Sequence, residues 1–319
     1  MHKSLGNVVP PEKVIARYGA DILRWWALAT DWRADVRIGE EIIERVADAY
    51  RKVRNTFRFL LGNLSDFSPL DSVLAQRLTA VDRVFAGHLA HRVARLKSDY
   101  EQFLFHRVAD GLLDLCTVDL SAVYLDVAKD RLYTLPPDHA ERRSAQTVLW
   151  RALHDLAIAA SPILVATSEE VWQSHEGLRT EAESVHLALW PAASVHTDAD
   201  EGAWGLLLEV RSAVNGALEP LRAAKQLATT LEAEVTLRAP AALARRLAPF
   251  RDELPGFLLV AAADVVETPG AAGLEIEARR TDFLKCERCW THRADVRAEG
   301  SEPRLCGRCV SALAVRREH

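Results

Sequence analysis

Four cysteines near the carboxyl end of this 319-residue chain constrain its fold more than any other feature. They form two Cys-x-x-Cys pairs, Cys286 with Cys289 and Cys306 with Cys309, which are separated by 16 residues. Two residues between paired thiolates let the backbone turn so that both sulfurs reach one tetrahedral ion, and two such pairs complete a four-sulfur shell. The spacing therefore predicts one structural Zn²⁺, because a closed shell leaves no position for a catalytic water.

The cysteine pattern has other interpretations. A disulfide or redox pair needs an oxidising compartment, but the sequence shows neither a stretch of signal-peptide type nor an apolar run of membrane-spanning length. His292 could replace one thiolate, although its spacing is less regular. The fifth cysteine, Cys116, lies in an apolar helical segment and is expected to be a small buried residue. We therefore expect a cytoplasmic chain without a membrane partner.

Composition and charge limit the class of protein. With 49% hydrophobic and 27% charged residues, the chain is an ordinary globular sequence of two or three domains. A net charge of -5 argues against a uniformly basic nucleic-acid binder. Residues 279–319 differ, because ten Lys/Arg and six Asp/Glu give +4, and four thiolates with one Zn²⁺ reduce this to +2. Such a segment can approach phosphates, although a solvated surface explains the same charge.

Helical periodicity dominates the first 190 residues. Between Glu40 and Leu61, one helical stripe is apolar: Val46, Tyr50, Val53, Phe57 and Leu60. Further helices are expected at 78–115, 121–129 and 144–172, the last interrupted at Ser161-Pro162. These amphipathic patterns and short connections predict a mainly α protein built on an antiparallel helical bundle.

A second stripe on the helix from Glu40 to Leu61 is basic. At about 100° per residue, Arg51, Arg54 and Arg58 lie within a sector of roughly 60°. Their stems can cover the core while the guanidinium groups reach a partner. A solvated face accounts for the same pattern, so the stripe alone does not decide between the two.

After residue 190 the pattern changes from helical to mixed. A polar linker is expected at 194–202, a long helix at about 203–228 and a half-buried strand at 232–238. Further elements of a small α+β unit are expected: strands at 257–260, 264–267 and 274–278, and a helix at 241–248. Together with a terminal zinc ribbon, this predicts four parts: 1–39, 40–194, 195–278 and 279–319.

The amino-terminal residues resemble a catalytic loop. Met1-His-Lys3-Ser4-Leu-Gly6-Asn7 is similar to the K-M-S-K-S loop of class I aminoacyl-tRNA synthetases, from the second residue of that motif onward. The stretches after it, 17–26 and 35–39, resemble those that follow this loop in the isoleucyl enzyme. Similar stretches continue along the chain: 50–64, 119–126, 129–133, 142–149, 184–191, 230–235 and the cysteine pairs with Trp290. The whole chain thus resembles the carboxyl-terminal portion of bacterial isoleucyl-tRNA synthetases.

This resemblance implies a ligase that attaches isoleucine to its tRNA at the expense of ATP. Lys3 and Ser4 match the catalytic loop, in which the lysine meets charge on an ATP phosphate as the transition state forms. The first lysine of the motif is missing, and His2 stands in place of its first serine. The sequence contains neither the H-I-G-H signature nor an editing domain. We therefore expect the 319-residue chain to be inactive alone, with ATP, Mg²⁺ and isoleucine handled by the full-length enzyme.

The resemblance implies that this chain binds tRNA. The helical bundle is expected to bind the anticodon stem and loop, together with the zinc-bearing carboxyl terminus. Unpaired bases are bound by stacking on aromatic or guanidinium planes, while Arg and Lys hold phosphates. The candidate contacts are Arg51, Arg54, Asn55, Arg58 and Trp290, although an indole packed over the zinc knuckle is the favoured alternative for Trp290. A second function class stays open, namely a stand-alone, non-catalytic RNA-binding module with structural zinc.

Overall fold

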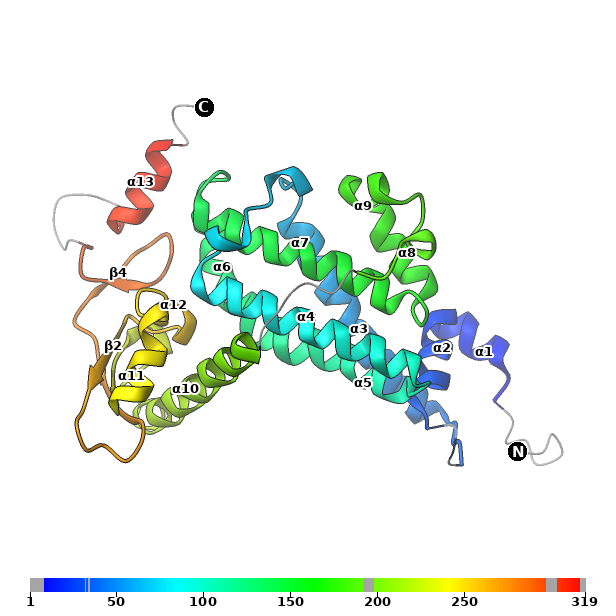
Figure 1. The fold of residues 1–319 in the computed structure, drawn as a ribbon, viewed down its shortest axis with the longest axis horizontal. Helices are drawn as coiled ribbons and strands as arrows, with labels where there is room; N and C mark the ends of the chain where they lie inside the picture. Colours follow the sequence, from blue (N-terminus) through cyan, green and yellow to red (C-terminus); the bar gives the residue numbers. More distant parts are fainter. Residues whose placement is uncertain (1–8, 32, 34, 192–197, 297–302, 316–319) are drawn as a thin grey trace. The chain divides into compact units, whose positions relative to one another are not determined.

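The computed structural model of the protein describes residues 9–31, 33, 35–191, 198–296 and 303–315. The chain forms two compact units and passes between them repeatedly (Figure 1). The first unit comprises residues 1–72, 88–126 and 146–196, and the second comprises 73–87, 127–145 and 197–319. Three helices contribute residues to both units: α4 (Ala80–Glu101), α6 (Leu125–Thr134) and α7 (Ala140–Ala160).

The first unit is helical throughout its described part. Its other helices are α1 (Pro11–Tyr18), α2 (Ala20–Ala29), α3 (Glu40–Asn63), α5 (Phe105–Asp114), the π-helix η4 (Leu115–Tyr124), α8 (Val165–Gln173) and α9 (Glu176–Glu181), with short 3₁₀ turns η2 (Pro69–Asp71) and η5 (Val185–Leu187). Helix α2 packs against α3 and α5, and α3 packs against η4 and α8. The prediction of a mainly α fold is therefore confirmed.

Helix α3 forms where the apolar stripe predicted it. Val53, Phe57 and Leu60 are buried, while Val46 and Tyr50 are partly buried. Burying one stripe of a helix against its neighbours supplies most of its stability, because an isolated helix is marginal in water. Cys116, on the neighbouring η4, is fully buried as expected.

Two side chains of helix α2 form hydrogen bonds with the backbone between the end of α7 and the start of α8. The Asp21 carboxylate accepts hydrogen bonds from the backbone N–H of Ala166 (3.2 Å) and of Thr167 (2.8 Å), at the start of α8. Arg24, one turn further along α2, donates to the carbonyl oxygens of Pro162 (2.7 Å) and Ile163 (3.1 Å). Helix termini leave such backbone groups without partners inside the helix. Asp21 therefore accepts from N–H groups at the start of α8, and Arg24 donates to carbonyl oxygens in the segment between α7 and α8.

Two helix boundaries differ from the sequence-based expectation. The helix predicted at 78–115 is broken, because α4 ends at Glu101 and α5 begins at Phe105. Phe103 adopts a left-handed φ of 57°, a local turn that apolar periodicity does not reveal. The segment predicted at 121–129 spans the end of η4 and the start of α6. The predicted interruption at Ser161-Pro162 is confirmed, since proline cannot continue a helix.

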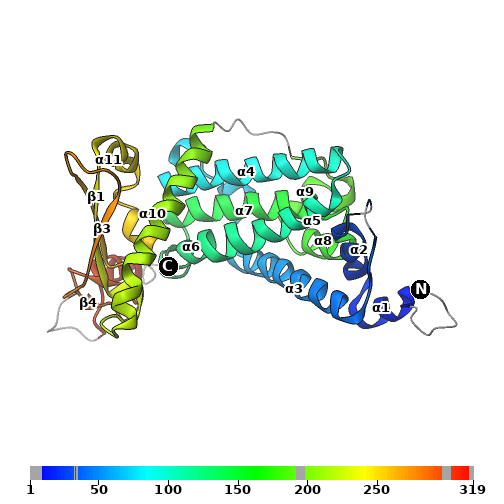
Figure 2. The ribbon, with the colours of Figure 1, turned by 90° about the horizontal axis from the view of Figure 1, so that it is seen from below.

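The second unit contains a three-stranded sheet of order β2-β1-β3. Strand β1 (Ala233–Ala239) pairs in parallel with β2 (Ala262–Glu267) and antiparallel with β3 (Glu275–Arg280). Helix α10 (Asp198–Ala223) packs against β3 (Figure 2). The helices α11 (Ala241–Leu247) and α12 (Leu254–Leu258) pack against β2. Its other elements are the 3₁₀ turns η3 (Ala75–Arg77), η6 (Thr230–Glu232) and η7 (Ala248–Phe250), the hairpin strands β4 (Leu284–Lys285) and β5 (His292–Arg293), and α13 (Gly307–Val315).

One predicted strand is wrong, and one helix is shifted. Residues 257–260 were expected to form a strand, but Phe257 and Leu258 end helix α12, and Leu259 follows with a left-handed φ of 56°. A short apolar run cannot be assigned by periodicity alone, and Pro255 at the first helical turn favours the helix. Helix α10 already includes residues 198–202, which were predicted as linker, and it ends at Ala223. The strands predicted at 232–238, 264–267 and 274–278 are confirmed as β1, β2 and β3.

A buried ion pair joins three helices inside the second unit. Asp82 at the start of α4 is fully buried, and Arg131 from α6 donates to both of its carboxylate oxygens, at 2.7 and 2.8 Å. Ser144 from α7 donates its hydroxyl to the same carboxylate at 2.5 Å. The carboxylate is thus charge-paired and hydrogen-bonded, as a buried charge requires.

Candidate metal centre and RNA-binding surfaces

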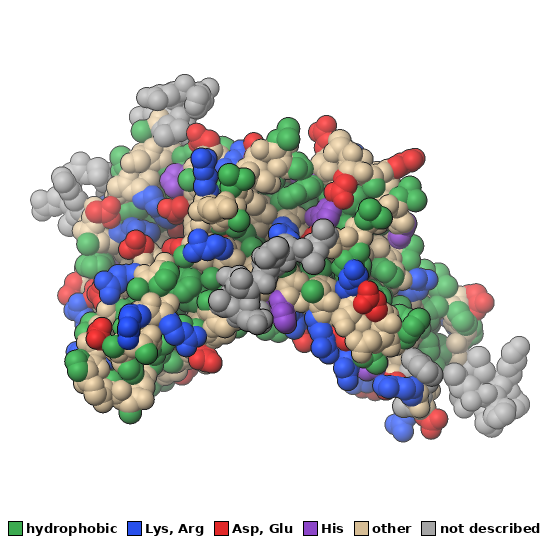
Figure 3. Space-filling view, viewed as in Figure 1, with side chains coloured by type: hydrophobic (Ala, Val, Ile, Leu, Met, Phe, Trp, Pro, Cys, Tyr) green, Lys and Arg blue, Asp and Glu red, His purple; other side chains and the backbone are tan. Residues whose placement is uncertain are grey.

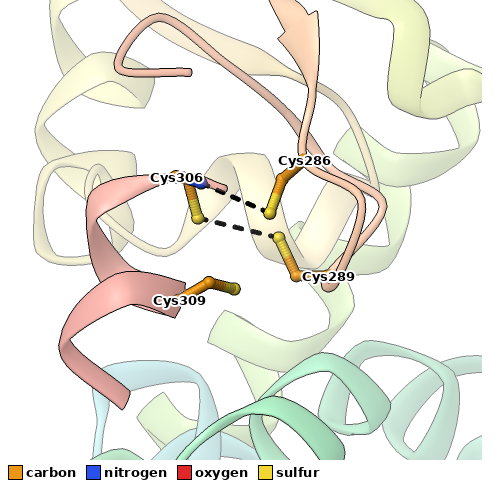
Figure 4. A group of neighbouring side chains, drawn as sticks. All are labelled: Cys286, Cys289, Cys306 and Cys309. Atoms are coloured by element: carbon orange, nitrogen blue, oxygen red, sulfur yellow. Dashed lines mark hydrogen bonds between the residues drawn. The ribbon is translucent and has the colours of Figure 1, made fainter. Parts of the chain in front are cut away.

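The four cysteines come together at one point of the second unit (Figure 4). Cys286 and Cys289 lie on the loop between β4 and β5, Cys306 directly precedes α13, and Cys309 lies in its first turn. Their sulfur atoms all lie within 4.8 Å of one another, and every cysteine is unpaired. The Cys289 and Cys306 sulfurs are 3.9 Å apart, which exceeds a disulfide bond of about 2.05 Å. Sulfurs about 2.3 Å from a tetrahedral Zn²⁺ stand about 3.8 Å apart, so this donor set fits that ion.

Hydrogen bonds to sulfur favour the thiolate form at one of these positions. Burial raises the pKa of the Cys286 thiol, but the backbone N–H groups of Cys289, Cys306 and Arg288 lower it to about 6. Burial raises the pKa of Cys306 to about 12 and also raises that of Cys309. A metal must displace protons from such thiols, so its binding couples to their ionisation.

Local hydrogen bonds fix the turns that carry the two cysteine pairs. Trp290 donates its backbone N–H to the Cys286 carbonyl at 2.9 Å and has a left-handed φ of 63°, which closes the first turn. Gly307 donates its N–H to the Asp295 carboxylate at 2.7 Å, where an added Cβ would lie only 2.9 Å from that oxygen. His292 is outside the cysteine cluster, and its Nδ1 lies 2.8 Å from the Phe283 carbonyl oxygen.

Trp290 is 65% exposed, so most of its indole surface is open to solvent. The Lys285 ammonium lies 5.7 Å from the centre of its ring, a cation–π distance. An exposed ring beside a cation presents a flat surface on which a base can stack.

The candidate side chains on α3 are all exposed: Arg51, Arg54, Asn55 and Arg58. Arg51 pairs with Asp48, and Arg54 lies 3.3 Å from Glu170 on α8. Arg58 has no ion pair within the described part of the chain. Exposed ion pairs contribute about 0–1 kcal/mol, so these arginines can exchange carboxylates for phosphates at little cost.

Charge distribution by itself does not mark an RNA surface. On the face shown in Figure 3, basic, acidic and apolar side chains are interspersed, and neither sign covers it. The candidate surfaces are therefore defined by the arginines of α3 and by the knuckle with Trp290. Lys3 and Ser4 lie outside the described residues. Among the described helices, none is both long and apolar enough to cross a bilayer.

Sequence reasoning missed one contact of the metal centre. Arg308, between Cys306 and Cys309, donates two hydrogen bonds of 2.6 Å to the carboxylate of Asp130 on α6. A signal for it was present, since both cysteine pairs carry arginine at the same place, as Cys-Glu-Arg288-Cys and Cys-Gly-Arg308-Cys. The partner could not be found, because Asp130 lies 178 residues away along the chain.

Three family descriptions match different parts of the chain. Residues 82–237 match the anticodon-binding domain of tRNA ligase, and residues 283–312 match the zinc finger found in FPG and IleRS. Residues 1–39 match the class I tRNA synthetases for I, L, M and V. The second match covers all four cysteines, so sequence family and geometry agree on a structural zinc site.

Curated relatives match almost the entire chain. The isoleucine–tRNA ligase of Thioalkalivibrio sulfidiphilus is 42% identical over 98% of this chain and 35% of its own length. Those of Syntrophotalea carbinolica and Shewanella amazonensis are 41% and 40% identical, over 99% and 98% of this chain. The chain spans about a third of the length of these relatives, 35% in each case. The chain therefore belongs to the isoleucine–tRNA ligase family, and it corresponds to the carboxyl-terminal part of those relatives.

Proposed function

We propose that this chain is the tRNA-binding part of an isoleucine–tRNA ligase. The observation that carries the proposal is the anticodon-binding domain match over residues 82–237, within a chain that is 42% identical to such a ligase over 98% of its length. The exposed arginine stripe and the exposed Trp290 support it chemically, because they supply phosphate contacts and a stacking surface.

The metal part of the proposal is one structural Zn²⁺ held by Cys286, Cys289, Cys306 and Cys309. Bound zinc would fix the loop between β4 and β5 to the start of α13, without an open position for catalysis. In this proposal the domain boundaries are those expected from the sequence: the helical bundle at 40–194, the α+β unit at 195–278 and the zinc ribbon at 279–319.

The catalytic role that we propose for Lys3 and Ser4 is supported by the family resemblance alone. By the family's chemistry, ATP, Mg²⁺ and isoleucine bind in a nucleotide-binding domain, and Lys3 with Ser4 would bring positive charge and a hydroxyl to the ATP phosphates. Such a ligase works in the cytoplasm, where tRNA is charged. A lysine can stabilise charge only on a phosphate that other groups have positioned.

We expect the 319-residue chain alone to catalyse no isoleucine-dependent exchange of pyrophosphate into ATP. The reason is that the chain supplies a lysine but no nucleotide-binding sheet in its sequence. Exchange of radioactive pyrophosphate, with and without isoleucine, measures this. An exchange rate above background that Lys3→Ala abolishes would contradict the expectation.

The chain should bind an isoleucine tRNA in a salt-dependent manner through α3. Loss of one phosphate contact should flatten the dependence of log K on log salt by about 0.7, the value for single strands. We expect Arg54→Ala and Arg58→Ala to lower affinity and flatten the slope in this way. Trp290→Ala should lower affinity by about 1–3 kcal/mol with little change in slope, because stacking releases few counterions. Filter binding over a salt series measures both quantities.

Lys52→Ala is the matched control, because Lys52 is an exposed cation on α3 outside the arginine stripe. Its removal should change affinity and slope less than Arg58→Ala does. A tRNA for a different amino acid tests specificity. Equal affinity for both tRNAs, unaffected by the three substitutions, would favour the stand-alone RNA-binding module over the ligase part.

A further inference from the structure

Each of the two cysteine pairs carries an arginine directly before its second cysteine, Arg288 and Arg308. Arg288 of the first pair donates from Nη1 to the Cys309 sulfur of the second, at 3.5 Å. Arg308 stands between the two cysteines of the second pair and donates both of its terminal amino groups to the Asp130 carboxylate on α6. Its Nε is buried without a hydrogen-bond partner in the described part of the chain.

The two arginines together match the charge of a zinc-loaded centre. Four thiolates and one Zn²⁺ carry a net charge of -2, and two guanidinium groups carry +2. Three of the four cysteines are buried, so an uncompensated double charge there would be costly. Donors to metal-bound ligands also hold them in orientation, and their loss typically lowers metal affinity by about 10–100-fold.

Arg308 also contacts helix α6. Besides its two bonds to Asp130, its Nη2 lies 3.3 Å from the hydroxyl oxygen of Thr134, one turn further along the helix. The side chains of Arg308 and Asp130 are 23% and 28% exposed. A bidentate, partly buried pair of this kind is stronger than an exposed one. The Arg308 guanidinium therefore links the turn that carries Cys306 and Cys309 to α6, within the second unit.

We propose that Arg288 is a donor to the zinc-bound Cys309 thiolate, and that Arg308 is a positioning residue which couples zinc binding to docking of the cysteine cluster on α6. This rests on the proposed zinc site and adds to it a link to the helical part of the second unit. A bound metal would fix Cys306 and Cys309 at the start of α13, and these set the place of Arg308 between them. The coupling is reciprocal, so contact with Asp130 should in turn strengthen zinc binding.

Zinc affinity of the 319-residue chain, measured by competition with a chromophoric chelator, tests the proposal. Arg308→Gln and Arg288→Gln should each weaken zinc binding about 10-fold or more. Arg304→Gln is the matched control, because Arg304 lies in the same segment with only an exposed pair, 3.5 Å from Glu287. Asp130→Asn should weaken binding less than Arg308→Gln does. The double variant of Asp130 and Arg308 should bind like Arg308→Gln alone, since both changes remove one interaction.

Each outcome separates the possibilities. Variants of Arg288 and Arg308 that bind zinc like Arg304→Gln would overturn the proposal. Additive losses in the double variant would overturn the coupling to α6. Should Arg308→Gln fail to fold, Arg308→Lys can replace it, because lysine keeps the charge but cannot donate two parallel hydrogen bonds to Asp130. Wild-type zinc affinity in Arg308→Lys would also contradict the proposal. A wild-type chain without bound zinc would defeat the zinc site as well, whereas zinc binding with unaffected variants would defeat this inference alone.

A second readout follows the docking directly. Removal of zinc from the wild-type chain should raise amide hydrogen exchange in α6 around Asp130 and Thr134, because the contact with Arg308 is lost. In Asp130→Asn the same removal should change exchange in α6 much less. Equal increases in both proteins would show that α6 responds to zinc by another route and would contradict the coupling.

Discussion

Removal of zinc should unfold the region from β4 to α13 while the rest of the chain stays folded. The core of this region consists of Cys286, Cys306 and Cys309 with Val296, and its hairpin strands are two residues each. So little apolar area cannot offset the entropy of ordering the backbone, and small domains of this kind need a metal or disulfides. Apparent zinc-binding free energies of about 10–16 kcal/mol in zinc-finger peptides are then folding free energy.

Metal analysis and limited proteolysis measure this result. We expect one zinc per chain, and a chelator should make the segment after Arg280 sensitive to protease. Cys306→Ala should have the same effect without chelator. Cys116→Ala is the control, because Cys116 is buried outside the cluster and should leave the zinc content unchanged. A carboxyl-terminal region that resists protease in a protein without zinc would contradict the prediction.

Arg131→Ala should destabilise the second unit by about 3–5 kcal/mol. This change removes the guanidinium that pairs with the buried Asp82 carboxylate, and the Ser144 hydroxyl that also donates to it carries no compensating charge. Breaking a buried pair from one side typically costs this much, whereas removing both partners costs less. Urea denaturation, followed by circular dichroism, gives the free energy of unfolding from the midpoint and slope.

Arg83→Ala provides the comparison, because Arg83 is the exposed neighbour of Asp82 on the same helix. Its loss should change the free energy of unfolding by less than about 0.5 kcal/mol. The double variant Asp82→Ala with Arg131→Ala should be destabilised less than the sum of the two single variants. Additive losses would mean that the pair does not act as a unit.

Several parts of the fold and site follow from short sequence patterns. The apolar stripe predicts which face of α3 is buried, because residues three and four apart share one face of a helix. The alternation in β1 predicts its half-buried pattern in the same way. The two Cys-x-x-Cys pairs predict a four-sulfur cluster, since each pair fixes its own turn. The members of the cysteine cluster could thus be named from sequence, although the helix that Arg308 binds beside them could not.

Other features depended on how distant segments meet. Residues 257–260 were expected to form a strand, but Phe257 and Leu258 belong to helix α12. A short apolar run fits either element until its neighbours are known. Asp21 caps a helix that begins about 145 residues later, and Arg308 binds a carboxylate 178 residues earlier.

The sequence by itself determined the helical class, the cysteine cluster and the family, because periodicity, spacing and motifs are properties of neighbouring residues. Only the tertiary structure decided which partner each charged side chain meets, as Asp21 does at α8, Arg131 at Asp82 and Arg308 at Asp130. The physical reason is that ion pairs and helix caps act over about 3 Å, a distance set by the path of the whole backbone.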